Sequence, residues 1–166
     1  MRRTLPYLLL SAVLLVLDQL SKSWLAAAVP HGSSRVVIPG FFNLSHVHNR
    51  GAIFGVFNRS AGPLVTGLLT TASLIALGLV LYYFFKAPPT EKLFRFTMSL
   101  ILAGALGNQI DRIFRGYVID FLDFFVGRYH FPSFNVADSC ITIGAGLLIL
   151  IFFFRKGTKC SLCSSN

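Results

Sequence analysis

Charged residues are scarce in this sequence. Asp, Glu, Lys and Arg make up only 13% of the 166 residues, whereas hydrophobic residues make up 54% and the mean hydropathy is +0.68. A soluble domain of this length has too small a core to bury so much apolar surface. The composition therefore excludes an ordinary soluble domain and predicts an integral membrane protein.

Acidic residues are the scarcer charged class. Six Asp and Glu stand against 15 Lys and Arg, which gives a net charge of +9. No nucleic-acid-binding motif accompanies this charge, so we expect contact with anionic lipid head groups and not with DNA or RNA. Cysteine is also rare. Cys160 and Cys163 form a single C-x-x-C, too few ligands for a closed four-ligand zinc site, and we expect no metal or other cofactor.

Four apolar stretches are long enough to cross a hydrocarbon core of about 30 Å as helices: 5–28, 64–85, 93–110 and 136–154. The predicted fold class is an all-α membrane protein with four transmembrane helices. Segment 36–57, rich in β-branched and aromatic residues, predicts a small β-containing extracytoplasmic element between helices one and two. We expect one membrane domain over residues 1–154 and a polar, disordered cytoplasmic tail over 155–166.

Four crossings would place both termini on one side of the membrane. Lys and Arg are denser in the short segments of that side, which the positive-inside rule assigns to the cytoplasm. A cleavable signal peptide is the alternative for the N-terminus, because Arg2 and Arg3 precede an apolar run. We favour a retained helix, since cleavage would discard Asp18 and Lys22.

Ionisable residues gather toward the outer side of the predicted helices. A charge inside a membrane segment costs at least ~2.5 kcal/mol on insertion scales and usually persists for a reason. Five of the six acids lie in or near the outer halves of helices or in segment 111–135: Asp18, Asp111, Asp120, Asp123 and Asp138. This one-sided distribution favours an interfacial active site over the alternative of a small transporter or channel, whose polar residues would run through the full membrane depth.

Helical spacing predicts two structural contacts in the membrane. Asp18 and Lys22 stand four residues apart, so they can form an ion pair that lowers the cost of inserting the helix into the membrane. The alternative is that the pair also contacts and supports a second helix. Asn108, Asp111 and Arg112 share one face of the third helix, and a structural polar clamp is favoured over chemistry for that face.

Two glycines lie beside this polar face. Gly104 and Gly107 carry no side chain, so another helix can approach the third helix closely at their positions.

Asn135 and Asp138 have the spacing of a capping box at the start of the fourth helix. Asp138 also lies near the outer interface, on the side that holds Asp120 and Asp123. Two neighbouring carboxylates cannot both ionise easily, so the pair holds one shared proton. This is the arrangement of an aspartic-protease dyad. Residue spacing does not decide whether Asp120 or Asp123 would be the partner.

Five blocks in order resemble those of lipoprotein signal peptidase, also called signal peptidase II, a family of bacterial membrane aspartyl peptidases. The blocks are DQLSK (18–22), NRGAIF (49–54), GALGNQIDR (104–112), GYVIDF (116–121) and FPSFNVADS (131–139). One departure is Ile53, where the family usually has a small residue. If that position lines the pocket, substrate fit would differ.

The resemblance implies a multi-pass enzyme of the bacterial cytoplasmic (inner) membrane, with its active site near the extracytoplasmic face. It assigns catalysis to Asp120 and Asp138 and leaves Asp123 outside the motif. The implied substrates are prolipoproteins carrying diacylglycerol on a cysteine, cut just before that cysteine, and we expect a monomer in contact with membrane lipids. The residues that would bind substrate or support the site are Asp18, Lys22, Asn49, Gly51, Asn108, Asp111, Arg112 and Asn135.

Two other enzyme classes fit less well. A metallopeptidase would use His46 and His48, which share a face if they lie on a strand, with His130 and a carboxylate, but no H-E-x-x-H is present. A Ser/Lys peptidase would need a serine next to Lys22, yet adjacent side chains on a helix point apart.

Overall fold

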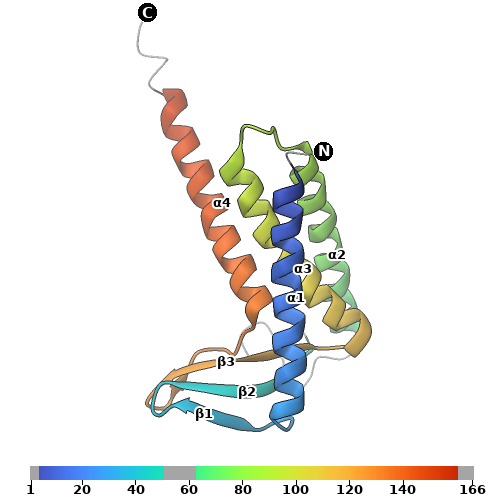
Figure 1. Cartoon of the computed structure of the whole chain (residues 1–166), viewed down its shortest axis with the longest axis vertical. Helices are drawn as coiled ribbons and strands as arrows, with labels where there is room; N and C mark the ends of the chain where they lie inside the picture. Colours follow the sequence, from blue (N-terminus) through green and yellow to red (C-terminus); the bar gives the residue numbers. More distant parts are fainter. Residues whose placement is uncertain (1–3, 51–62, 161–166) are drawn as a thin grey trace, which may run out of the picture.

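The computed structural model describes residues 4–50 and 63–160. Helices occupy all four predicted apolar stretches, and strands lie in both long connections between them. The elements in chain order are α1 (Leu5–Ala28), β1 (Ser34–Ile38), β2 (Phe42–Asn49), α2 (Pro63–Lys86), α3 (Lys92–Arg115), β3 (Val118–Val126), β4 (Tyr129–His130) and α4 (Val136–Cys160). Figure 1 shows the helices side by side with the strands gathered at one end of the molecule.

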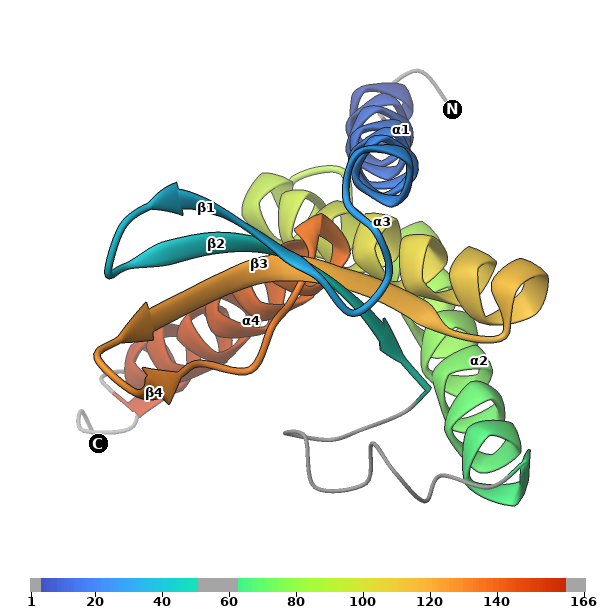
Figure 2. The ribbon, with the colours of Figure 1, turned by 90° about the horizontal axis from the view of Figure 1, so that it is seen from below.

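The strands form one antiparallel sheet in the order β1-β2-β3-β4. The prediction placed the β-containing element between helices one and two only. That prediction was too narrow, because β3 and β4 come from the connection between α3 and α4. Figure 2, seen from below, shows β2 lying between β1 and β3 in front of the helices. Gly116, with a left-handed φ of 75°, ends α3 and turns the chain into β3.

α3 is the central helix, because it contacts α1, α2 and α4. Its buried positions include the polar residues Arg95, Asn108, Gln109 and Asp111. Protein neighbours instead of lipid surround these side chains, so their hydrogen-bonding groups can be satisfied within the bundle. The polarity of α3 is therefore a consequence of its place in the fold.

Within the described residues, two helices are long and apolar enough to span a membrane: Leu5–Ala28 and Val136–Phe154. The stretch Thr70–Lys86 of α2 is a shorter apolar helix. Four transmembrane helices are therefore not confirmed by length and composition. The fourth helix continues to Cys160, past the predicted start of the polar tail, and residues 161–166 lie outside the described part of the chain.

The start of α4 packs closely on α3, as Gly104 and Gly107 predicted. A Cβ atom at Gly107 would lie 2.5 Å from Asp18 Oδ2 and 3.3 Å from the Cβ of Ala137, and one at Gly104 would collide with the Ala137 carbonyl. These two glycines therefore set the distance between α3, α4 and the polar part of α1. A small apolar core of Leu25, Val29, Ile119 and Phe121 joins the end of α1 to β3.

Candidate active site

Asp120 lies on β3 with only 3% of its surface exposed. Its two carboxylate oxygens each accept a hydrogen bond from an amide side chain. Asn135 Nδ2 donates to Oδ1 at 2.7 Å, and Asn49 Nδ2, at the end of β2, donates to Oδ2 at 2.9 Å. The pairing of β2 with β3 thus brings Asn49 to a carboxylate 71 positions away in the chain.

Asp138 lies in the first turn of α4 and forms the predicted capping box with Asn135. The Asp138 backbone N–H donates to Asn135 Oδ1 at 2.9 Å, and the Asn135 N–H donates to Asp138 Oδ2 at 3.3 Å. The other oxygen, Oδ1, accepts from Asn108 Nδ2 at 2.7 Å. Asn135 therefore contacts both Asp120 and Asp138, and the structure brings these two acids to the same place.

The pKa of Asp120 is raised to about 7, first because the carboxyl is buried and second because it faces the charge of Asp138. Hydrogen bonds from Asn49 and Asn135 act in the opposite direction, since they favour the ionised form. Burial and like charge prevail, so this carboxyl can hold a proton near neutral pH.

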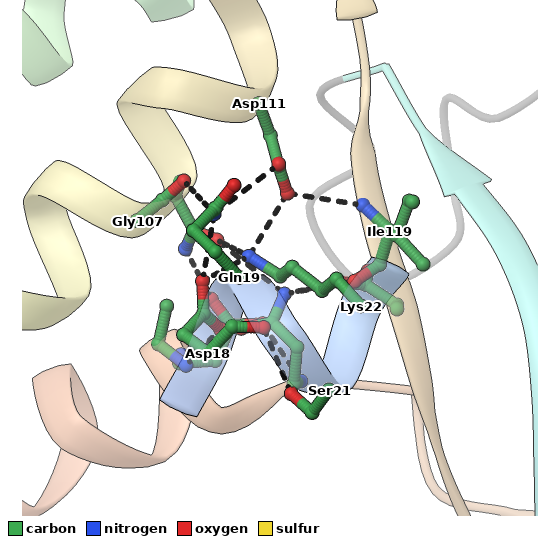
Figure 3. Close-up of polar contacts among 12 residues, drawn as sticks. Asp18, Gln19, Ser21, Lys22, Gly107, Asp111 and Ile119 are labelled. Atoms are coloured by element: carbon green, nitrogen blue, oxygen red, sulfur yellow. Dashed lines mark hydrogen bonds and ion pairs between the residues drawn. The ribbon is translucent and has the colours of Figure 1, made fainter. Parts of the chain in front are cut away.

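Lys22 is fully buried at the centre of an ion-pair network. Its Nζ lies 2.8 Å from Asp18 Oδ2 and 2.9 Å from Asp111 Oδ2, and it donates to Asn108 Oδ1 at 3.1 Å. Figure 3 shows Lys22 reaching from α1 toward Asp111 on α3. The predicted Asp18–Lys22 pair is confirmed, and Arg115 supplies a second positive charge to Asp111.

The network also holds the start of α4. Asp18 Oδ1 accepts from the backbone N–H of Ala137 at 2.9 Å. Asn108 joins the network to the acid pair, because its Oδ1 accepts from Lys22 while its Nδ2 donates to Asp138. A continuous chain of polar contacts thus runs from α1 through α3 to the acids.

Comparison with known proteins identifies the family of this chain. Residues 10–154 match the family described as Signal peptidase (SPase) II. The chain belongs to the signal peptidase II family. Its sequence is 44% identical over 156 residues to the lipoprotein signal peptidase of Francisella tularensis subsp. novicida (strain U112), covering 94% of this chain and 96% of that one. It is 43% identical over 154 residues to the lipoprotein signal peptidase of Syntrophus aciditrophicus (strain SB), covering 92% and 95%.

Solved structures agree with this family membership. The fold superposes on a bacterial membrane enzyme determined by the in meso method at 2.3 Å with a TM-score of 0.81 and 33% sequence identity, covering 93% of this chain and 91% of that one. A second such structure, at 1.9 Å, gives a TM-score of 0.77 at 33% identity, covering 89% and 92%. The fold is thus that of a membrane enzyme, and signal peptidase II is a protease family.

The structure does not describe Gly51 and Ile53. Gly51 was predicted to bind substrate or support the site, and Ile53 was noted as a departure from the signal peptidase II family. Arg112 is partly buried, with its charge near both Asp120 and Asp138. Sequence reasoning missed Gln19, whose Nε2 donates to the Gly107 carbonyl at 3.2 Å. No helical spacing pattern in the sequence links Gln19 to Gly107, so the contact is seen only when α1 packs against α3.

A cavity of about 560 Å³ lies beside Asp120 and extends toward Asp123. Asp123 Oδ1 lies 2.8 Å from His130 Nδ1, and Ser45 Oγ donates to Asp123 Oδ2 at 3.2 Å. Asp120, Asn49, Asp123 and His130 all line the cavity, while Asp138 is not among the described residues that line it. Asp123 thus has partners of its own, separate from the Asn135-centred pair.

The metallopeptidase alternative finds no three-ligand site in the described part of the chain. His46 and His48 lie together on β2 and contact each other, whereas His130 is paired with Asp123. No group of three or more His, Cys, Asp or Glu side chains among the described residues has the geometry to hold a metal ion.

Proposed function

We propose that this protein is a membrane-embedded aspartyl endopeptidase that removes the signal peptide from diacylglyceryl-modified prolipoproteins. The cut falls just before the lipidated cysteine, and Asp120 and Asp138 form the catalytic dyad. One observation carries the proposal: Asn135 hydrogen-bonds both carboxylates, which supports a proton shared between the buried Asp120 and the partly buried Asp138. Family membership and the names of the lipoprotein signal peptidase relatives support the substrate class.

The dyad works with one proton between two carboxyl groups. The ionised carboxylate takes a proton from water as the water oxygen attacks the scissile carbonyl carbon, and the protonated carboxyl donates a hydrogen bond to the carbonyl oxygen. The C–N bond then breaks as the amide nitrogen receives a proton from the dyad. The raised pKa of Asp120 supports this scheme, because it keeps the shared proton in place near neutral pH.

The remaining polar residues position this pair. Asn49 and Asn135 orient Asp120, whereas Asn108 orients Asp138. Lys22 joins α1 to α3 through Asp18 and Asp111, and the positive charge of Arg112 stands near the dyad. Gly51 is assigned to the substrate-binding set by family resemblance alone.

We also propose a membrane arrangement for this fold. We place all four helices across the inner membrane, with α1 retained, both termini cytoplasmic and the chain acting as a monomer. Figure 1 supports this placement, since the start of α1 and the end of α4 lie at one end of the molecule and the sheet lies at the other. The dyad, at the sheet end, would then face the extracytoplasmic side, where water and the substrate cysteine meet.

The test is cleavage of a diacylglyceryl-modified precursor by the purified protein in detergent or lipid. Wild type is compared with Asp120→Asn, Asp138→Asn and Asp123→Asn, with and without a metal chelator. We expect chelator-resistant cleavage that disappears in both dyad variants. Asp123→Asn is the matched comparison, because it removes an acid from the same strand and cavity, and it should retain measurable cleavage. Persistent cleavage in Asp120→Asn and Asp138→Asn would overturn the assignment.

A further inference from the structure

Three histidines form a cluster at the junction of α1 and the sheet: His31, His46 and His48. His46 and His48 are alternate residues of β2 and therefore point to the same face of the strand. Their Nε2 atoms lie 3.1 Å apart. The side chains of the histidine cluster contact each other, whereas Asn49 of β2 contacts Asp120. His46 also lines the cavity beside Asp120.

His46 is held in one orientation and one tautomer. It is buried, and its Nδ1 lies 2.8 Å from the Val29 carbonyl oxygen. A carbonyl only accepts hydrogen bonds, so Nδ1 carries the proton and the neutral ring presents the lone pair of Nε2 toward His48. A histidine that donates its second ring N–H to a backbone carbonyl is the usual form of a metal-ligating histidine.

His48 is fixed by stacking on both sides. The Tyr117 ring lies 3.6 Å from it at an interplanar angle of 19°, and the His31 ring lies 3.8 Å away at 29°. A cavity of about 390 Å³ adjoins the three rings and is also lined by Arg50. His31 and Arg50 are exposed, so solutes can reach the cluster from the surface.

We propose that His46 and His48 chelate one divalent transition-metal ion, such as Cu²⁺ or Zn²⁺, between their Nε2 atoms. Two imidazole nitrogens about 2.0–2.1 Å from a tetrahedral ion stand about 3.3 Å apart, so the observed pair needs only a small displacement to admit one. His31 stays stacked on His48 and helps to hold its ring. Water completes the coordination.

The ion takes the place of a proton in the His46–His48 contact. Without metal, His48 donates its Nε2–H to the lone pair of His46. When an ion binds, His48 carries its proton on Nδ1 and both Nε2 lone pairs face the metal, so the protein loses no net proton. The charge of Arg50 opposes a cation, and the site therefore selects ions that bind imidazole strongly over Mg²⁺ or Ca²⁺.

The experiment measures metal binding to the full-length protein in detergent, with any affinity tag removed. The parent carries Cys160→Ser and Cys163→Ser, because thiolates would bind Zn²⁺ themselves. His48→Phe removes the nitrogens and keeps a stacking ring, and His130→Gln is the control for a histidine outside the cluster. Titration calorimetry with Zn²⁺ gives stoichiometry and affinity, and electron paramagnetic resonance with Cu²⁺ counts bound nitrogens. Melting temperatures without metal check that each variant is folded.

We expect one Zn²⁺ per parent chain, an affinity roughly tenfold or more lower in His48→Phe, and no change in His130→Gln. The Cu²⁺ spectrum should show at least two imidazole nitrogens in the parent and one fewer in His48→Phe. The proposal is overturned if the folded parent binds no Zn²⁺ or Cu²⁺, if His48→Phe binds as tightly as the parent, or if His130→Gln is the variant that loses the ion. Peptidase activity takes no part in these readouts.

Discussion

The side-chain amide of Asn135 donates to Asp120 Oδ1 at 2.7 Å, so the residue that caps α4 also orients a carboxylate on β3. Replacing it with alanine should remove both functions. We expect Asn135→Ala to lower kcat for precursor cleavage roughly 10²-fold, because a small displacement of a catalytic group costs about that much. Loss of the cap should also cost about 1 kcal/mol of stability. Cleavage kinetics and melting temperature measure the two effects.

Asn135→Ser separates these effects. Serine is a good N-cap, but its shorter side chain does not reach Asp120, so stability should be kept while kcat still falls. Asn43→Ala is the control for loss of a partly buried asparagine elsewhere on the sheet, since Asn43 donates to Asp123. Full activity in Asn135→Ser would contradict the orienting role.

The raised pKa of Asp120, about 7, predicts how activity depends on pH. The proposed dyad needs one proton, so kcat/KM should fall as pH rises above about 7, approaching roughly tenfold per pH unit. Precursor cleavage measured from about pH 5 to about pH 9 tests this. A flat profile up to about pH 9 would show that the shared proton is not lost in this range.

The stability of the folded protein should also fall as pH rises. Because the folded protein holds a proton that an unfolded chain with an ordinary carboxyl pKa of 3.8 has released, stability falls as pH rises from about 4 to about 7. Asp120→Asn cannot titrate, so its melting temperature should vary less over this interval than that of wild type. Parallel profiles for the two proteins would argue against a raised pKa at Asp120.

Contacts within one segment were predictable from spacing alone. The capping box of Asn135 and Asp138 and the ion pair of Asp18 and Lys22 each join residues three or four positions apart, and both are present. Contacts between segments were not predictable in this way. The pairing of Lys22 with Asp111 depends on how α1 packs against α3, which no local pattern specifies.

The strand β3 shows the same limit. Its sequence, VIDFLDFFV, is nearly continuous in apolar residues, and acids at positions three apart do not fit the alternation of a half-buried strand. No local pattern therefore predicted a buried strand position for Asp120 or Asp123. They are instead buried, because Asn49, Asn135, Ser45 and His130 satisfy their oxygens. The family resemblance, and not residue spacing, selected Asp120 for the catalytic role.

Lys22 lies between two buried carboxylates, and its removal should be costly. Lys22→Met leaves Asp18 without a positive partner and removes one of the positive charges paired with Asp111. We therefore expect the free energy of unfolding to fall by about 3–5 kcal/mol. Melting temperature in detergent measures the loss. Lys92→Met removes an exposed lysine of α3 and should change stability by no more than about 0.5 kcal/mol.

A second substitution tests the cause of that loss. Adding Asp18→Asn to Lys22→Met should restore part of the stability, because the unpaired charge is removed and Asp111 keeps Arg115. If the double variant is less stable than Lys22→Met, packing of the lysine stem and not charge balance explains its burial.

Gly107 tests whether close packing between helices supports the site. In Gly107→Ala the new methyl group would lie 2.5 Å from Asp18 Oδ2, a carboxylate that Lys22 and the Ala137 N–H hold in place. The helices must separate, so we expect a loss of about 1–3 kcal/mol and reduced cleavage, since Ala137 adjoins Asp138. Gly78→Ala on α2 is the matched control, because its methyl group would meet nothing within 4 Å and alanine favours a helix. Melting temperatures of the two variants relative to wild type decide the point: equal values would mean that α3 and α4 can move apart without cost, and that the glycine is not what positions the dyad.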